Sequence, residues 1–149
     1  MQISGSREFP TPPGTTYALL TNPEALKRAM PGLKELQAQS DTYYNAELEL
    51  GVAGIKGKYK GHLELTQVVP DVGYTMILHG EGAMGFMDAT VSVSLETSEN
   101  GGTTLQYDGD AKVGGTVAGV GQRMLSGVAK LIIGQFFNGL QKEAEALET

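Results

Sequence analysis

The chain contains no cysteine, no tryptophan and only two histidines among its 149 residues. The absence of cysteine excludes disulfide bonds, zinc–thiolate centres and thiol catalysis. The histidines, His62 and His79, lie on separate stretches, and no serine stands in the Gly-x-Ser-x-Gly context of an activated nucleophile. The sequence therefore predicts no catalytic residue, no metal site and no cofactor.

Long uninterrupted apolar runs are also missing. The most apolar stretch, residues 114–137, is broken by Gln122, Arg123 and Lys130, and the N-terminus lacks the apolar core of a signal peptide. We therefore expect a cytoplasmic protein without a transmembrane segment, and we leave open a peripheral contact with the inner face of the membrane. The net charge of −6 argues against nucleic acid as a partner, because phosphate binding needs a positive field.

The composition is that of a globular protein, with 40% hydrophobic and 19% charged residues. The length suits one domain over residues 1–149. Glycine stands out, because 21 glycines are about twice the usual share. Six methionines add apolar side chains that adapt to irregular shapes.

The periodicity of apolar residues predicts the order of elements. Residues 2–9 alternate like a strand, and residues 15–30 read as two short helices, the second starting at Asn22 before a proline. From the end of the second helix at residues 31–33 to residue 113, apolar and polar residues alternate over about six strands that bury one face. Glycines within these strands suggest bends or bulges. A long amphipathic helix ends the chain.

A sheet with one apolar face must cover that face, and only the C-terminal helix is long enough to do so. A long twisted sheet curls. We therefore predict a curled antiparallel sheet around the helix, with either a packed core or a cavity between them.

The glycines of residues 114–134 first suggest a phosphate-binding loop, but the spacing fails. A Gly-x-Gly-x-x-Gly motif would need a glycine at Met124, and Gly121-Gln122-Arg123 replaces Gly-Lys-Ser/Thr. On a helical projection from residue 117, Gly121 falls near the centre of the apolar arc, and the other glycines fall on its back or edge. We predict that Gly121 leaves room for a ligand and that the back-face glycines admit the short helices or another subunit.

A ladder of lysines occupies the polar face of one predicted strand, at Lys56, Lys58 and Lys60. We expect these lysines to pair across strands with Glu47 and Glu49. Contact with an acidic protein partner is the alternative.

Three segments carry a resemblance to a known family: "ALKRAMPGLKEL" (25–36), "GGTVAGVGQRML" (114–125) and "GQFFNGL" (134–140). They resemble the family of the carbon monoxide dehydrogenase G-subunit, within the START/Bet v 1-like superfamily. The resemblance covers residues 1–147 and implies an α+β helix-grip fold. In that fold, two short helices follow the first strand, and a seven-stranded curled antiparallel sheet wraps around a long C-terminal helix, with a cavity between them.

The resemblance also implies a non-catalytic accessory protein of a carbon monoxide dehydrogenase-type molybdenum hydroxylase, with a quinone or lipid as ligand. Longer family members continue into a membrane-binding segment, whereas this chain stops at "KEAEALET", which favours a carrier over an anchor. Two alternatives stay open: a cyclase/aromatase-like enzyme using Tyr59, Tyr107, His79 or Asp88, and an assembly protein without a ligand. A homodimer is also left open.

The expected binding site consists of apolar residues on the inner strand faces and on the facing side of the long helix. Tyr59 and Tyr107 are expected to donate hydrogen bonds to a ligand carbonyl. The expected lining residues are Leu50, Val52, Tyr59, Met76, Leu78, Met84, Phe86, Met87, Tyr107, Val113, Val120, Gly121, Met124 and Val128.

Overall fold

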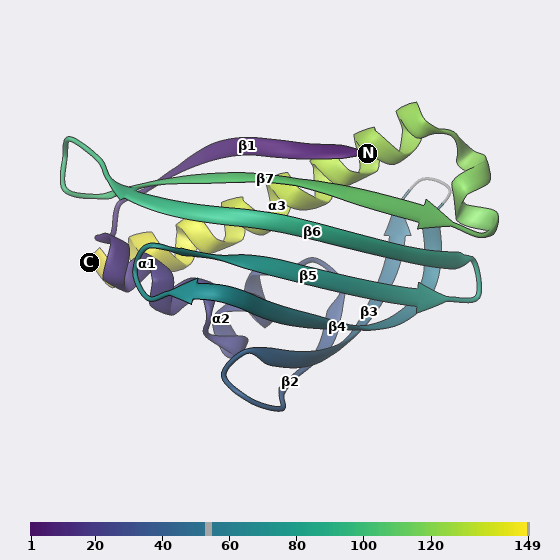
Figure 1. Ribbon diagram of the computed structural model, residues 1–149, viewed down its shortest axis with the longest axis horizontal. Coiled ribbons are helices and arrows are strands. Elements are labelled where there is room, and N and C mark those ends of the chain that lie inside the picture. The colour runs from purple at the N-terminus through teal and green to yellow at the C-terminus, as the bar shows by residue number, and fades with distance from the viewer. Residues whose placement is uncertain (53–54, 149) are drawn as a thin grey trace.

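The computed structural model describes residues 1–52 and 55–148, apart from the side chains of Val52 and Ile55. Eleven elements follow one another along the chain (Figure 1). They are β1 (Gln2–Phe9), α1 (Pro13–Leu20), α2 (Pro23–Ala29), β2 (Leu33–Ala38), β3 (Tyr43–Val52), β4 (Ile55–Val69), β5 (Gly73–Gly82), β6 (Gly85–Thr97), β7 (Thr103–Gly114), the 3₁₀ helix η1 (Thr116–Val120) and α3 (Gln122–Glu148).

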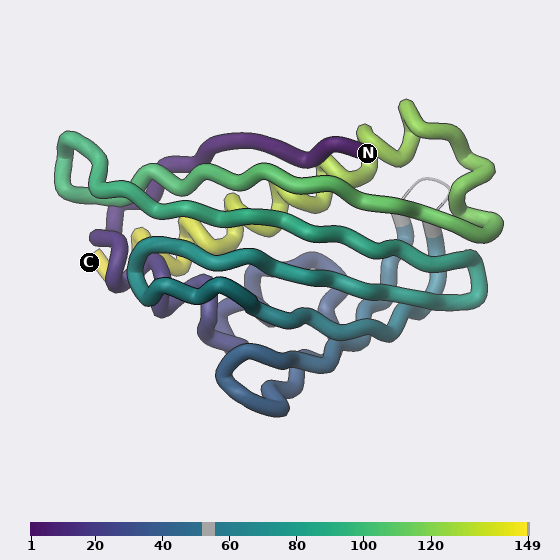
Figure 2. Tube along the Cα trace, viewed as in Figure 1, coloured from purple at the N-terminus to yellow at the C-terminus, as the bar shows by residue number. Residues whose placement is uncertain are grey.

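The strands form one antiparallel sheet in the order β1-β7-β6-β5-β4-β3-β2. Strands β2 to β7 are a meander, and β1 joins the far edge beside β7. The sheet curls, and α3 runs along one of its faces (Figures 1 and 2). This confirms the predicted helix-grip fold, and we call the sheet face toward α3 the inner face.

The two short helices begin where the sequence predicts. Pro13 opens α1, and the side chain of Asn22 caps α2 by accepting hydrogen bonds from the backbone N–H groups of Glu24 and Ala25, at 2.9 and 3.4 Å. Proline at the first helical position suits α2, because its missing N–H has no partner inside the helix.

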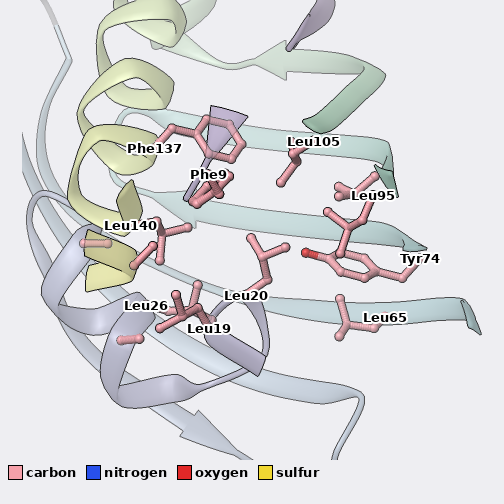
Figure 3. Packing of buried hydrophobic residues seen from close by; sticks show 14 of the residues in the cluster. Phe9, Leu19, Leu20, Leu26, Leu65, Tyr74, Leu95, Leu105, Phe137 and Leu140 are labelled. Atoms are coloured by element: carbon pink, nitrogen blue, oxygen red, sulfur yellow. The ribbon is translucent and has the colours of Figure 1, made fainter. Parts of the chain in front are cut away.

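One end of the molecule has a dense core, which we call the closed end (Figure 3). There α1, α2 and the last half of α3 meet the inner face, and α3 has α2, α1 and β1 among its main neighbours. Leu105 and Leu140 are fully buried. The ring of Phe137 stacks on Tyr107 at 5.1 Å and meets the edge of Phe9 at 6.4 Å.

At the other end of α3 the packing is looser, and we call this region the open end. Among the described residues of its apolar cluster, only Val117 and Val128 are buried, at 5% and 7% exposure. The remaining members are half-buried. They are Leu50, Tyr59, Met84, Val113, Leu125 and Ile132.

The start of the long helix differs from the prediction. Residues 116–120 form η1, and α3 begins only at Gln122. Gly121 lies between them with φ +96°, in the left-handed region that no α-helix contains. The prediction that Gly121 lies inside the helix, on its apolar arc, is therefore wrong. Its role is to turn the chain from η1 into α3.

The glycines within α3 differ in their surroundings. A Cβ atom at Gly139 would lie 2.9 Å from the Cα of Ala29, so this glycine lets α2 approach. A Cβ atom at Gly127 would meet no heavy atom within 4 Å, nor would one at Gly119 in η1. A short helix is therefore admitted by Gly139, a glycine for which no such role was predicted, and not by Gly119 or Gly127.

Candidate ligand-binding site

The open end brings together several of the expected lining residues. Leu50, Tyr59, Met84, Val113 and Val128 belong to one cluster. They come from β3, β4, the β5–β6 turn, β7 and α3, so distant parts of the chain converge there. Leu78 and Met87 are half-buried, and the strand register places them on the same inner face.

Other expected residues lie elsewhere. Phe86 is next to Met87 in β6 and therefore points to the outer face, where it is 43% exposed and its ring covers Gly114. Its assignment to the inner lining is a wrong prediction. Met124 is 47% exposed, at the surface of α3. Met76 packs against the closed-end core, Val120 is half-buried in η1, and the side chain of Val52 lies outside the described residues.

A patch without side chains lies on the inner face. Gly61 of β4 is paired with Gly80 of β5, and Gly82 is paired with Tyr59. A Cβ atom at Gly80 would meet no heavy atom within 4 Å, so space is open above it. At Gly82 a Cβ atom would lie 2.9 Å from the ring of Tyr59, so this glycine lets the ring lie flat on β5. We call Gly61, Gly80 and Gly82 the glycine patch.

The hydroxyl of Tyr59 is buried and has no hydrogen-bond partner among the described residues. A buried hydroxyl without a partner costs about 1–3 kcal/mol. Its surroundings are the apolar side chains of the open end. The open end therefore contains one polar atom with unused hydrogen-bonding capacity, beside a patch that no side chain fills.

Tyr107 does not join Tyr59. Its ring stacks on Phe137 at the closed end, and its hydroxyl occupies the space where Gly5 would carry a Cβ atom. Tyr107 and Tyr59 belong to different clusters. The structure therefore leaves Tyr59 as the hydrogen-bonding residue of the open end.

Two of the four groups weighed for an enzyme, His79 and Asp88, lie on the outer face. Nδ1 of His79 is 2.6 Å from a carboxylate oxygen of Asp88, and its Nε2 is 3.5 Å from Glu81. The hydrogen bond with Asp88 is the main cause that raises the pKa of His79. The ring of His62 stacks between Tyr43 and His79, at 5.4 Å from each. Among the described residues, no group of acidic and histidine side chains is arranged to hold a metal ion.

Two surface hollows lie away from α3's first half. One of about 650 Å³ lies on the outer face over β4–β7, and one of about 280 Å³ lies between α1 and the last turns of α3. The candidate site at the open end is therefore defined by the residues around it, the glycine patch and Tyr59.

The glycine patch is a feature that sequence reasoning missed, because the pattern alone suggests bends or bulges at the glycines of β4 and β5. The signal is present in the sequence, since Gly61, Gly80 and Gly82 share the strand face of Leu63 and Leu78 in the alternating pattern. The predicted lysine ladder is confirmed at one position, where Lys60 and Glu47 pair at 3.7 Å.

An antiparallel sheet curled around a long terminal helix, with an incompletely filled inner face, defines a helix-grip protein of the START/Bet v 1-like class. The sequence matches the profile of the carbon monoxide dehydrogenase G-subunit (CoxG) family over residues 5–145. The chain belongs to this family.

Solved structures agree with this assignment. A conserved protein from Geobacillus kaustophilus is 37% identical, with a TM-score of 0.94 over 98% of this chain and 96% of that one. A START superfamily protein from Mycobacterium smegmatis is 14% identical, with a TM-score of 0.74 over 98% of each chain. Ara h 8.0201 is 10% identical, with a TM-score of 0.72 over 98% of each chain. The last two share the fold alone.

No protein of curated function matches the sequence. In the part of the chain that the structure describes, no helix is long and apolar enough to cross a membrane.

Proposed function

We propose that this protein binds a hydrophobic small molecule that carries an oxygen atom, such as a quinone or a lipid, at the open end between the sheet and α3. The observation that carries the proposal is the buried hydroxyl of Tyr59 without a partner among the described residues, beside the open space over Gly80. A ligand oxygen would complete the hydrogen bonding of Tyr59, and the apolar part of the ligand would cover the glycine patch.

The energies favour such a ligand. Each methylene group that leaves water contributes about 0.8 kcal/mol, so a few isoprene or acyl units suffice for micromolar binding. A hydrogen bond to Tyr59 adds about 0.5–1.5 kcal/mol. The apolar part therefore supplies the affinity, and Tyr59 selects ligands that carry an oxygen atom.

The wider role that we propose is that of a non-catalytic, cytoplasmic accessory protein for a carbon monoxide dehydrogenase-type molybdenum hydroxylase. Membership of the CoxG family supports this role. The position of His79 and Asp88 on the outer face supports the absence of catalysis, because it removes them from the ligand site. Co-purification with a molybdenum hydroxylase from the native organism tests the role, and failure of such an enzyme to bind the pure protein would contradict it.

The ligand site is tested by filling the glycine patch. Gly80→Leu should fold, because a Cβ atom there would meet no heavy atom within 4 Å and the backbone is outside the left-handed region. Uptake of a short-chain ubiquinone or of oleic acid, followed by native mass spectrometry, should fall by about tenfold or more, the loss expected when burial of two methylene groups is prevented.

Gly127→Leu is the matched control, because Gly127 also faces open space but lies on the exposed side of α3. It should bind both probes like the unchanged protein. Tyr59→Phe should weaken the binding of both probes by roughly two- to tenfold. Equal ligand uptake by Gly80→Leu and Gly127→Leu would show that the glycine patch is not part of the ligand site.

A further inference from the structure

A second feature of the inner face lies far from Tyr59. Arg7 of β1 is paired with Leu105 and therefore shares the face of the buried core. Along β1 and β3–β7, the other described residues of this face are uncharged. Arg7 is half-buried, so a permanently charged group lies in the seam between β1 and α3.

The guanidinium of Arg7 is held in place by neutral groups. Its Nη1 donates a hydrogen bond to Oδ1 of Asn138 at 3.0 Å, and its central carbon lies 5.7 Å from the ring centre of Phe137. Among the described residues, no carboxylate lies within 4 Å of Arg7. By contrast, Arg28 forms an ion pair with Glu143. Because a guanidinium has five N–H donors, most donors of Arg7 have no partner among the described residues.

Gly134 of α3 lies beside this guanidinium. A Cβ atom at Gly134 would lie 3.6 Å from Nη2 of Arg7, which is an ordinary contact. Packing therefore does not require glycine here, in contrast to Gly139. Since glycine weakens a helix relative to alanine, Gly134 lowers the stability of α3 without relieving a clash. What the missing side chain provides is space next to the free donors.

The charged residues of this part of α3 are basic, whereas Glu8, next to Arg7 in β1, uses its carboxylate to accept a hydrogen bond from Thr104. Residues 111–142 contain no aspartate or glutamate, although the net charge of the chain is −6. Lys130 is exposed and lies one helical turn before Gly134, so it stands on the same side of α3. The side-chain oxygen of Asn138 accepts a hydrogen bond from Arg7, and its NH₂ group has no acceptor among the residues that the structure describes.

We propose that Arg7, with Lys130 and the amide of Asn138, binds an anionic oxygen group, a carboxylate or a phosphate, in the seam between β1 and α3. The planar fork of a guanidinium matches two oxygens of such a group, and charge-assisted hydrogen bonds are stronger than neutral ones. Partial burial strengthens the attraction further, because water screens it less. This site is separate from the apolar site at the open end and does not depend on it.

The proposal is tested by NMR titration of the ¹⁵N-labelled protein with inorganic phosphate and with octyl phosphate. Both should give saturable shifts of the Asn138 side-chain amide and the Gly134 backbone amide. Arg7→Met should weaken the binding by about tenfold or more, as expected when a hydrogen-bonded charge is removed. Arg28→Met, at an arginine that already has a carboxylate partner, should leave the titration unchanged.

Should Arg7→Met fail to fold, Arg7→Lys keeps the charge and lacks the fork, and it should also bind phosphate more weakly. Tighter binding of octyl phosphate than of inorganic phosphate would support the head group of an amphiphile as the ligand. Equal binding of the two would support a free anion. Shifts that do not saturate, or that saturate with unchanged affinity in Arg7→Met or Arg7→Lys, would overturn the proposal.

Discussion

The two ends of α3 lie against the same sheet but are packed differently. At the closed end, Leu105, Leu140 and Ala144 are fully buried, and two short helices complete the core. At the open end, the cluster has only two buried residues among those that the structure describes, neither of them fully buried, and Leu131 of α3 is 46% exposed. The closed end therefore supplies most of the burial that stabilises the fold.

This difference in packing indicates that the two ends have different roles. Since the closed end holds α3 on the sheet, the open end can keep unfilled space and an unsatisfied hydroxyl without loss of the fold. A stability cost at a ligand site is common, because groups placed for a ligand are not optimally placed for packing. Each of the following changes should affect one end more than the other.

The largest effect is expected from truncating the closed-end core. Leu140→Ala should lower the free energy of unfolding by about 2–5 kcal/mol, because a fully buried leucine leaves a cavity. Leu125→Ala, the same change at the half-buried open end, should cost clearly less. Urea denaturation followed by circular dichroism compares them, and equal losses would contradict the division into two ends.

Two glycines of α3 should respond to alanine with opposite signs. Gly139→Ala should destabilise by about 1–3 kcal/mol, because the new methyl group meets the backbone of Ala29. Gly127→Ala should stabilise by up to about 1 kcal/mol, since the helix gains propensity and the methyl group meets nothing. Thermal unfolding of the two variants measures the difference, and a shared sign would refute this account of the glycines.

Removing the hydroxyl of Tyr59 should not harm the ligand-free protein. Tyr59→Phe should leave its stability unchanged or raise it by about 1 kcal/mol, because a buried oxygen without a described partner is lost. The hydroxyl of Tyr44 donates a hydrogen bond to the carbonyl of Asp41 at 3.2 Å, so Tyr44→Phe should destabilise the protein. Denaturant melts of the ligand-free variants test this, and a loss of stability in Tyr59→Phe would mean that the hydroxyl has a partner.

The smallest effect is expected on the outer face. The pKa of His79 is raised in the folded state, chiefly by its hydrogen bond with Asp88. The pair therefore stabilises the fold fully below the unfolded pKa of about 6.5, and its contribution is lost as the pH rises through the folded pKa. Asp88→Asn should lower the pKa of His79 in an NMR titration and reduce stability slightly at about pH 6, but not at about pH 9. An unchanged pKa of His79 would show that Asp88 does not stabilise the protonated imidazole.

The fold could be predicted from the sequence because its signals are local. Alternation over residues 44–113 indicates the meander, and Asn22 before Pro23 indicates the start of α2. The site was only partly predictable. The pairing of Gly61 with Gly80 depends on the register of β4 and β5. Gly121 has a φ angle outside the α-helical region, and a helical projection assumes helical angles throughout. The contact of Arg7 with Asn138 joins residues 131 positions apart, so no local pattern reveals it.

The most direct test of the ligand site uses the methionine methyl groups as probes. In protein labelled with ¹³C-methyl methionine, a short-chain ubiquinone or oleic acid should shift the signals of Met84 and Met87, which lie at the open end and on the inner face. Met30, outside the open-end cluster, should not shift. Shifts confined to Met30, or none at ligand saturation, would contradict binding between the glycine patch and α3.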